Sequence, residues 1–176
     1  HMPYKGLIMA ILISPMIVPL IITAAGMFFF YARINLVYSF TGIILAHVAL
    51  ATPFVVITVT ATLVGFDMNM VKASQSLGAR PVRTFFKIIM PLILPGVISG
   101  ALFAFITSFD EVVIVMFMAS LDQLTIPKQM WAGIRQEISP VILCMATCLV
   151  ILSIFLLTTV ELLRRRSEKL RGITAR

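Results

Sequence analysis

The sequence predicts an all-α membrane protein, a helical bundle of about four transmembrane helices. Of the 176 residues, 60% are hydrophobic and 12% are charged, and the mean hydropathy is +1.08, whereas soluble domains carry about a quarter charged residues. A helix needs about 20 apolar residues to cross a hydrocarbon core about 30 Å thick. Four runs reach that length, namely residues 6–31, 39–66, 92–119 and 139–163.

The first run contains two prolines, Pro15 and Pro19. Membrane helices tolerate proline because neighbouring helices and Ser or Thr side chains satisfy the freed backbone groups, so we expect a kink near Pro15. The run is longer than the apolar core of about 7–15 residues in a secretory signal peptide, and further spans follow it. We therefore expect no removable segment, and the short connection 32–38 predicts that the first two spans form an antiparallel pair.

Polar and reactive residues are sparse in the second and fourth runs. His47 lies in the second run near several threonines, and an intramembrane His is a functional candidate. A lone His beside hydroxyl groups more often makes a hydrogen bond between helices, and we favour that interpretation. In the fourth run, Cys144 and Cys148 share one helical face without a CxxC pattern or a matching His cluster, so we interpret them as buried apolar thiols.

Residues 67–90 form a less apolar insert between the second and third spans. Asp67 is placed to cap a helix over residues 68–77, and Gly78 follows in the position where a left-handed backbone is common. Pro81 suits the first turn of a second short helix. Both helices have amphipathic spacing, so the insert is predicted to be two short helices joined by a sharp glycine turn.

Two functions fit such an insert. On periodicity alone, it could be an interfacial helix pair that anchors a loop among lipid headgroups. A glycine corner, followed by Pro91 and Pro95 at the entry to the third span, instead predicts a fixed bend. A fixed bend favours docking to another protein.

The net charge of +7 is distributed unevenly along the chain. If the insert faces the cytoplasm, the basic residues on the outer side are only Arg33, Lys128 and Arg135. The cytoplasmic side would then hold the other basic residues, which are Lys5, Lys72, Arg80, Arg83, Lys87 and those of the segment 164–176. By the positive-inside rule, both termini and the insert are therefore cytoplasmic. The membrane accounts for the basic pI, and nucleic acid is not an expected partner.

Asp110 and Glu111 fall in the third span, about two thirds of the way toward the outside. A buried acid there costs about 2.5–3.5 kcal/mol, so the pair should face protein or water. Adjacent helical residues point about 100° apart, so at most one carboxylate can face a translocation path. In a confined cavity that carboxylate would attract a cation, with cation–π faces from Phe109 and Trp131. The alternatives are acids solvated at a shallow outer end and aromatic residues that anchor the interface.

The insert resembles a motif of the permease subunits of bacterial ABC importers. That family carries E-A-A-x3-G-x9-I-x-L-P in a cytoplasmic loop, where this chain reads KASQSLGARPVRTFFKIIMP. The matching residues are Ala73, Gly78, Ile88 and Pro91. Lys72, Ser74 and Met90 stand where the family has Glu, Ala and Leu.

Four further stretches look like spermidine/putrescine-type permeases, the second permease of that pair in particular. They are TPFVVITVTATLVGFD, SFDEVVIVMFM, TIPKQMWAGIR and SPVILCMATCLVILS. The resemblance implies that residues 1–166 form an ABC importer transmembrane domain, followed by a basic cytoplasmic tail at 167–176. Family members have six spans, which implies that two precede the first residue here.

The resemblance implies a multi-pass protein of the bacterial inner membrane that binds no cofactor itself. The chain has no G-x-x-x-x-G-K-[ST] loop for phosphates, so ATP and Mg²⁺ would sit on a dimer of partner ATPases. The residues implied to lie in the ATPase groove are Lys72, Ala73, Ser74, Gly78, Ala79 and Arg80. A second permease subunit, an extracytoplasmic binding protein and membrane lipid are the other implied partners.

Polyamine is the preferred cargo, delivered by a binding protein to the outer segment 120–137, which could equally be a solvated loop. Other small solutes, such as an opine, a phosphonate or ferric iron, remain alternatives within transport. Outside transport, the chain could be a membrane scaffold or channel. Because it has no Ser/His/Asp set and no metal-ligand cluster, we do not expect an enzyme.

Overall fold

The computed structural model describes residues 4–136 and 139–170, and within these ranges it contains helices and connections without a strand. The helices are α1 (Lys5–Ile17), α2 (Leu20–Arg33), α3 (Phe40–Val64), α4 (Met68–Ser76), α5 (Pro81–Thr84), a π-helical turn (Phe85–Ile89), α6 (Met90–Phe109), α7 (Val113–Met118), α8 (Ile126–Gln136) and α9 (Pro140–Leu170). Three helical stretches are long and apolar enough to cross a membrane, or four if α1 and α2 count as one bent span. The predicted all-α membrane fold is confirmed.

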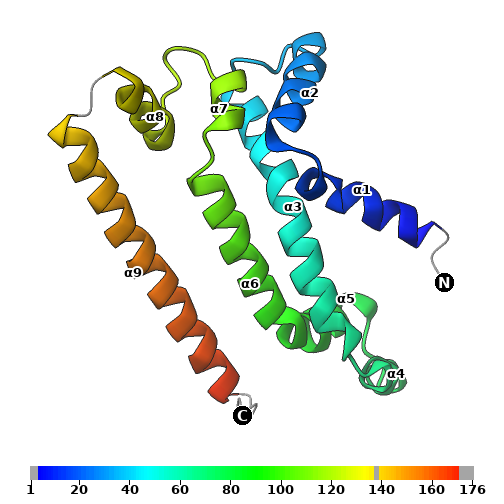
Figure 1. The fold of residues 1–176 in the computed structure, drawn as a ribbon. Helices are drawn as coiled ribbons and strands as arrows, with labels where there is room; N and C mark the ends of the chain where they lie inside the picture. Colours follow the sequence, from blue (N-terminus) through cyan, green and yellow to red (C-terminus); the bar gives the residue numbers. More distant parts are fainter. Residues whose placement is uncertain (1–3, 137–138, 171–176) are drawn as a thin grey trace.

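The long helices separate two groups of short ones (Figure 1). α3 and α6 run side by side, and α9 contacts α6. α2, α7 and α8 gather at one end of these helices, whereas α4 and α5 lie at the other end, together with the C-terminal end of α9. The insert and the predicted outer segment therefore occupy opposite ends of the molecule.

The first apolar run is a broken helix and not a single rod. Val18 has an extended backbone with φ −74° and ψ 135°, and the axes of α1 and α2 differ by 111°. Proline disfavours helical geometry in the residue before it and has no N–H to donate, so the break falls at Val18, immediately before Pro19. Pro15 stays within α1, so the expected kink is displaced. α1 packs on α3 while α2 packs on α7, in place of one span antiparallel to α3.

The third apolar run also differs from the single span expected over residues 92–119. α6 ends at Phe109 and α7 begins at Val113, so Asp110–Val112 form a non-helical break. At the other end, the helix is continuous from Pro81 to Phe109, and Pro91 does not interrupt it. Because proline cannot donate the N–H of a regular α-helical ladder, the wider π-helical turn immediately before Pro91 accommodates the irregularity.

Two glycines allow α3 and α6 to approach closely. A Cβ added to Gly96 would clash with the Thr62 side chain and lie 2.9 Å from the Thr58 carbonyl oxygen, and one added to Gly100 would lie 3.0 Å from Val55 Cα. The threonine hydroxyls donate to carbonyls of their own helix, at 2.9 Å in both cases. The contact is therefore backbone against small side chains, the arrangement that a G-x-x-x-G spacing produces in membranes.

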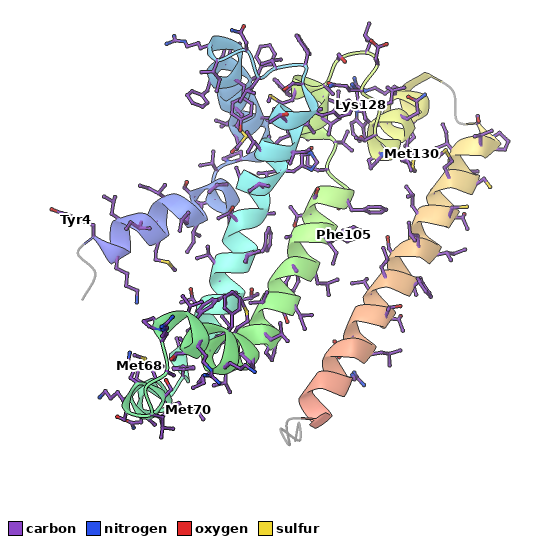
Figure 2. The ribbon with its side chains drawn as sticks, turned by 180° about the vertical axis from the view of Figure 1, so that it is seen from behind. Tyr4, Met68, Met70, Phe105, Lys128 and Met130 are labelled. Atoms are coloured by element: carbon purple, nitrogen blue, oxygen red, sulfur yellow. The ribbon has the colours of Figure 1, made fainter. Side chains whose placement is uncertain are left out.

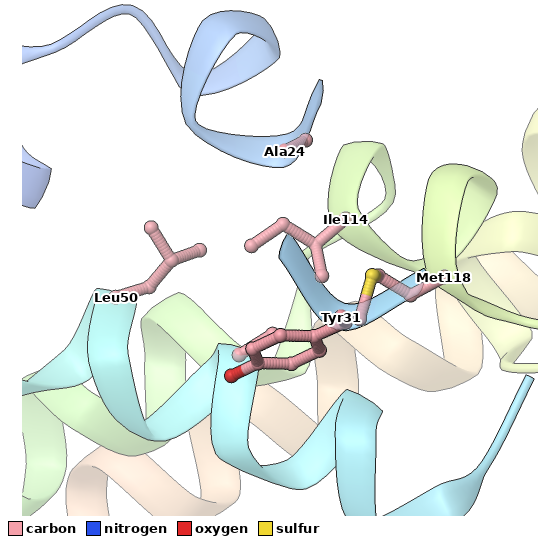
Figure 3. Packing of buried hydrophobic residues seen from close by; sticks show 6 residues of the cluster. Ala24, Tyr31, Leu50, Ile114 and Met118 are labelled. Carbon is pink, nitrogen blue, oxygen red and sulfur yellow. The ribbon is translucent and has the colours of Figure 1, made fainter. Parts of the chain in front are cut away.

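A small hydrophobic core lies where α2 and α7 meet the N-terminal part of α3. It is formed by Ala24, Tyr31, Ala46, Leu50, Ile114 and Met118. Figure 3 shows Ile114 and Met118 of α7 facing Tyr31 and Ala24 of α2 and Leu50 of α3. This core holds α7 in place beyond the break in the third run.

α9 is apolar but hardly packed within the chain. None of the residues in its most hydrophobic window is buried, and its described contacts are with α6 and α8. Cys144 and Cys148 are exposed, which corrects the expectation that they are buried thiols. The helix periodicity does place them on one face, but no other helix of the described chain covers that face.

We expect Gly96→Ala to destabilise the protein by about 1–3 kcal/mol, because the added methyl group overpacks the α3–α6 contact. Gly26→Ala in α2 is the matched control, since a Cβ there meets nothing within 4 Å. Thermal unfolding of the purified protein in detergent checks this. Equal unfolding midpoints for the two variants would contradict the close contact between the helices.

Candidate functional site

The insert is a compact helical hairpin at one end of the α3–α6 pair. The Asp67 side chain accepts a hydrogen bond from the Asn69 N–H at 2.9 Å, which confirms the predicted cap of α4. Gly78 has φ 78°, which confirms the predicted left-handed turn. The N–H groups of Gly78 and Ala79 donate to the carbonyls of Gln75 and Ser74 at 2.9 and 3.0 Å, so the end of α4 is closed by backbone hydrogen bonds.

Ser74 holds the two helices of the hairpin together. Its hydroxyl lies 3.0 Å from the Thr84 hydroxyl, and the two residues are only 6% and 3% exposed. The sequence grouped Ser74 with residues that contact a partner, yet the structure points it inward. An Ala at this position, as in the family motif, could not make this hydrogen bond. The bond is internal to the hairpin, so it gives Ser74 a structural role that does not depend on a partner.

The other predicted coupling residues lie at the surface of the hairpin. Lys72, Ala73, Gly78 and Arg80 are exposed, and Ala79 is partly exposed. Several large apolar side chains of the insert are exposed as well, namely Met68, Met70, Leu77, Val82 and Phe86. Figure 2 shows Met68 and Met70 on α4, at the tip of the molecule. Exposed apolar side chains surrounded by polar residues are typical of a surface that contacts another protein or the membrane.

A second candidate site lies at the opposite end, at the break after α6. A cavity of about 420 Å³ is bordered by the end of α6, by α8 and by α9, and it is lined by Phe109, Asp110, Trp131 and apolar residues. Met130 of α8 also lines it and is marked in Figure 2. Three of the four predicted pathway residues are thus brought together. Asp110 supplies the one carboxylate of this lining.

The side chains of Glu111 and Asp110 point to different surroundings. Its side chain is 3% exposed, whereas Asp110 is exposed. The Glu111 carboxylate accepts hydrogen bonds from the Ile114 N–H at 2.9 Å and the Val115 N–H at 3.2 Å. Glu111 therefore caps α7. Both acids also border a cavity of about 370 Å³ on the side of α1 and α3, so Asp110 lies between two cavities.

His47 of α3 lies beside this break. Its Nδ1 atom is 2.7 Å from the Ser108 hydroxyl of α6, which confirms the predicted hydrogen bond between helices. Its Nε2 atom is 3.9 Å from Oε2 of Glu111. His47 was expected to pair with hydroxyl groups, but its proximity to Glu111 was not visible in the sequence because 64 positions separate the two residues.

The ring face of Trp131 is in contact with a cation of the same chain. The Arg135 guanidinium carbon lies 5.8 Å from the centre of the Trp131 ring, within the range of a cation–π contact. The spacing of four residues on one helix could have revealed this pair. The other aromatic candidate, Phe109, stacks on Phe105, with ring centres 5.3 Å apart.

Gln123 is a structural residue of the outer segment that the sequence did not single out. Its side chain donates to the Tyr38 carbonyl at 3.3 Å and accepts from the Ser120 N–H at 3.0 Å. The Lys128 ammonium donates to the Ser120 carbonyl at 3.2 Å. The turn between α7 and α8 is thereby joined to the connection between α2 and α3, so this segment is an organised surface and not a loose loop.

Comparison with known proteins finds a matching family and several similar proteins. Residues 3–169 match the family described as binding-protein-dependent transport system inner membrane component. The chain is similar to the spermidine/putrescine transport system permease protein PotC of Haemophilus influenzae, with 31% identity over 164 residues, 93% of this chain and 62% of that protein. The putrescine transport system permease protein PotI of Escherichia coli strain K12 is 30% identical over 140 residues, 76% of this chain and 50% of that protein.

The PotC protein of Escherichia coli strain K12 shows 29% identity over 165 residues, which cover 94% of this chain and 61% of that protein. The chain thus spans at most 62% of the length of these relatives. The match to the family, in contrast, extends over nearly the whole chain. The chain therefore belongs to the binding-protein-dependent transport system inner membrane components and is a multi-pass protein of the inner membrane.

Proposed function

We propose that this chain is the permease subunit of an ATP-driven importer and forms half of the path through which a polyamine crosses the membrane. The observation that carries the proposal is the hairpin of α4 and α5, with its glycine corner, at the end of the closely packed α3–α6 pair. Family membership and the similarity to relatives named as spermidine or putrescine permeases support it.

The hairpin is built to pass motion into the membrane helices. α4 follows α3 after a connection of a few residues, and α5 continues through the π-helical turn into α6. The Ser74–Thr84 hydrogen bond fixes α4 against α5, and Gly96 and Gly100 bring α6 against α3. A force on α4 therefore moves α3 and α6 as one body, as hinge and shear transitions require.

This role requires partners of defined kinds. The chain has no phosphate-binding loop of its own, so an ATPase pair binds ATP and Mg²⁺ and docks on the exposed surface of the hairpin. A second permease subunit supplies the other half of the path, and an extracytoplasmic binding protein delivers the cargo. The organised surface around Gln123 and α8, at the end opposite the hairpin, is where the binding protein docks.

The charge distribution sets the orientation. α9 ends at the same end of the molecule as the hairpin (Figure 1), and its C-terminal part carries Arg164, Arg165, Arg166 and Lys169. Both are placed in the cytoplasm by the positive-inside rule. Lys5 at the start of α1 assigns the N-terminus of this chain to the same side.

The chemistry of the 420 Å³ cavity suits a polyamine. Asp110 offers a negative charge for an ammonium group, and the other lining residues are mostly apolar and fit the methylene chain between the amines. A carboxylate attracts a cation more strongly beside apolar protein surface than in bulk water. An anionic solute would be repelled by the same carboxylate.

Gly78→Val should reduce transport-coupled ATP hydrolysis of the complete transporter by at least about tenfold, because a β-branched residue is strained in the left-handed backbone. Membrane insertion should be unchanged. Gly65→Val is the matched control, since Gly65 has φ −91° and open space around it. Coupled hydrolysis that persists in the Gly78 variant would contradict the coupling role, and loss of lipid binding by the insert after neutralising Arg80, Arg83 and Lys87 would indicate a lipid anchor.

Asp110→Asn should raise the KM for putrescine uptake by about 10- to 100-fold, which corresponds to the loss of one hydrogen bond to a charged group. Asp122→Asn, in the outer turn between α7 and α8, should change the KM much less, because Asp122 lines none of the cavities around Asp110. Uptake by proteoliposomes that contain the complete transporter measures both. Equal effects of the two substitutions would argue against the cavity as the cargo site.

A further inference from the structure

We propose that His47, Ser108 and Glu111, here called the clamp, are positioning residues that hold the break between α6 and α7 and thereby set the direction of Asp110. The clamp joins three helices at the point where the third apolar run leaves helical geometry. The inference rests on the proposed function in one respect, namely that Asp110 contacts the cargo.

The break needs such a device because it exposes backbone groups inside an apolar region. The last helical hydrogen bond recorded at the end of α6 runs from the Asp110 N–H to the Ile106 carbonyl at 3.3 Å. The N–H groups at the start of α7 have no helical partner, as at any helix start, and lipid offers none. Glu111 supplies both of its oxygens to Ile114 and Val115.

The cap fixes which way the two neighbouring acids point. Ile114 and Val115 are fully buried, so the Glu111 carboxylate that bonds to their N–H groups must lie inside the protein. Asp110 precedes it at the end of α6 and is exposed to the cavity that it shares with Phe109 and Trp131. While Glu111 stays in place, the Asp110 carboxylate is available to a ligand in that cavity.

His47 connects the two sides of the break. Its Nδ1 atom bonds the Ser108 hydroxyl at 2.7 Å, before the break, and its Nε2 atom faces Oε2 of Glu111, within the break, at 3.9 Å. Among the buried side-chain polar atoms of residues 4–136 and 139–170, His47 Nε2 is the one that lacks a hydrogen bond. At 3.9 Å the gap to Glu111 is too long for a direct hydrogen bond.

The place of His47 on α3 gives the clamp a role in transport. α3 runs from the hairpin at one end to His47 near the other (Figure 1). A shift of the α3–α6 pair that begins at the hairpin therefore reaches Glu111 and the start of α7 through His47. In this way the clamp places Asp110 according to the position of that pair, without touching the cargo itself.

A double-mutant cycle for putrescine uptake tests the positioning role in the complete reconstituted transporter. Ser108→Ala should raise the KM by about three- to tenfold, and the same substitution in an Asp110→Asn background should add no further rise, because interacting residues are not additive. Ser108→Thr keeps the hydroxyl and should restore the KM. Thr52→Ala is the control, since that hydroxyl bonds only its own helix, at the Val48 carbonyl. An equal rise in both backgrounds would overturn the proposal.

A labelling experiment tests the clamp independently of the cargo. The exposed Cys144 and Cys148 are first replaced by alanine, and Asp110→Cys is then labelled with a membrane-impermeant cationic thiol reagent. Adding His47→Ala should change the labelling rate at position 110 by at least about threefold, because reactivity follows exposure of the thiol. The rate of an Asp122→Cys variant should not change.

The two experiments separate the possible failures. Labelling at position 110 that is indifferent to His47→Ala and Ser108→Ala would overturn the clamp, whatever the cargo. An unchanged KM for putrescine in Asp110→Asn would instead overturn the assignment of the cargo site, while the labelling result would still decide on the clamp. Glu111→Ala is not used alone, since it removes both hydrogen bonds that begin α7.

Discussion

The close contact between α3 and α6 is the constraint on which the rest of the molecule depends. Gly96 and Gly100 leave no room for a side chain against Val55, Thr58 and Thr62. Lipid tails are as apolar as the side chains, so moving a side chain from lipid to another helix brings little hydrophobic stabilisation. Membrane helices therefore associate through close packing of small residues. This contact joins two helices whose connection is the α4–α5 hairpin, and the proposed coupling of the hairpin to the membrane helices rests on it.

The two breaks in the apolar runs shape the end of the molecule opposite the hairpin. The bend at Val18 sends α2 across to α7, and the non-helical residues 110–112 let α7 leave the line of α6. α2, α3 and α7 then enclose the core around Ile114 and Met118. An unbroken third span would have carried Asp110 and Glu111 on one rod. The break instead directs one acid to a cavity and uses the other to cap a helix.

The sequence predicted the local geometry of the hairpin well, because caps, glycine turns and N-terminal prolines depend on residues close in the chain. Asp67, Gly78 and Pro81 all lie as their residue types suggest. The role of Glu111 in a cargo path stays a prediction, and what helical spacing did not indicate is that residues 110–112 leave the helix and that Glu111 caps α7. The GVISG spacing at Gly96 to Gly100 was the available signal for the α3–α6 contact, and it was not used.

By itself, the sequence determined the membrane setting, the helical class and the position of the hairpin, since apolar run length and short-range capping fix these features locally. Only the tertiary structure decided that Ser74 bonds Thr84, that Glu111 faces inward and that His47 lies between Ser108 and Glu111. Each of these depends on the register and direction of helices packed on one another. Residues far apart in the chain meet there, and no periodicity within a single segment specifies which atoms approach.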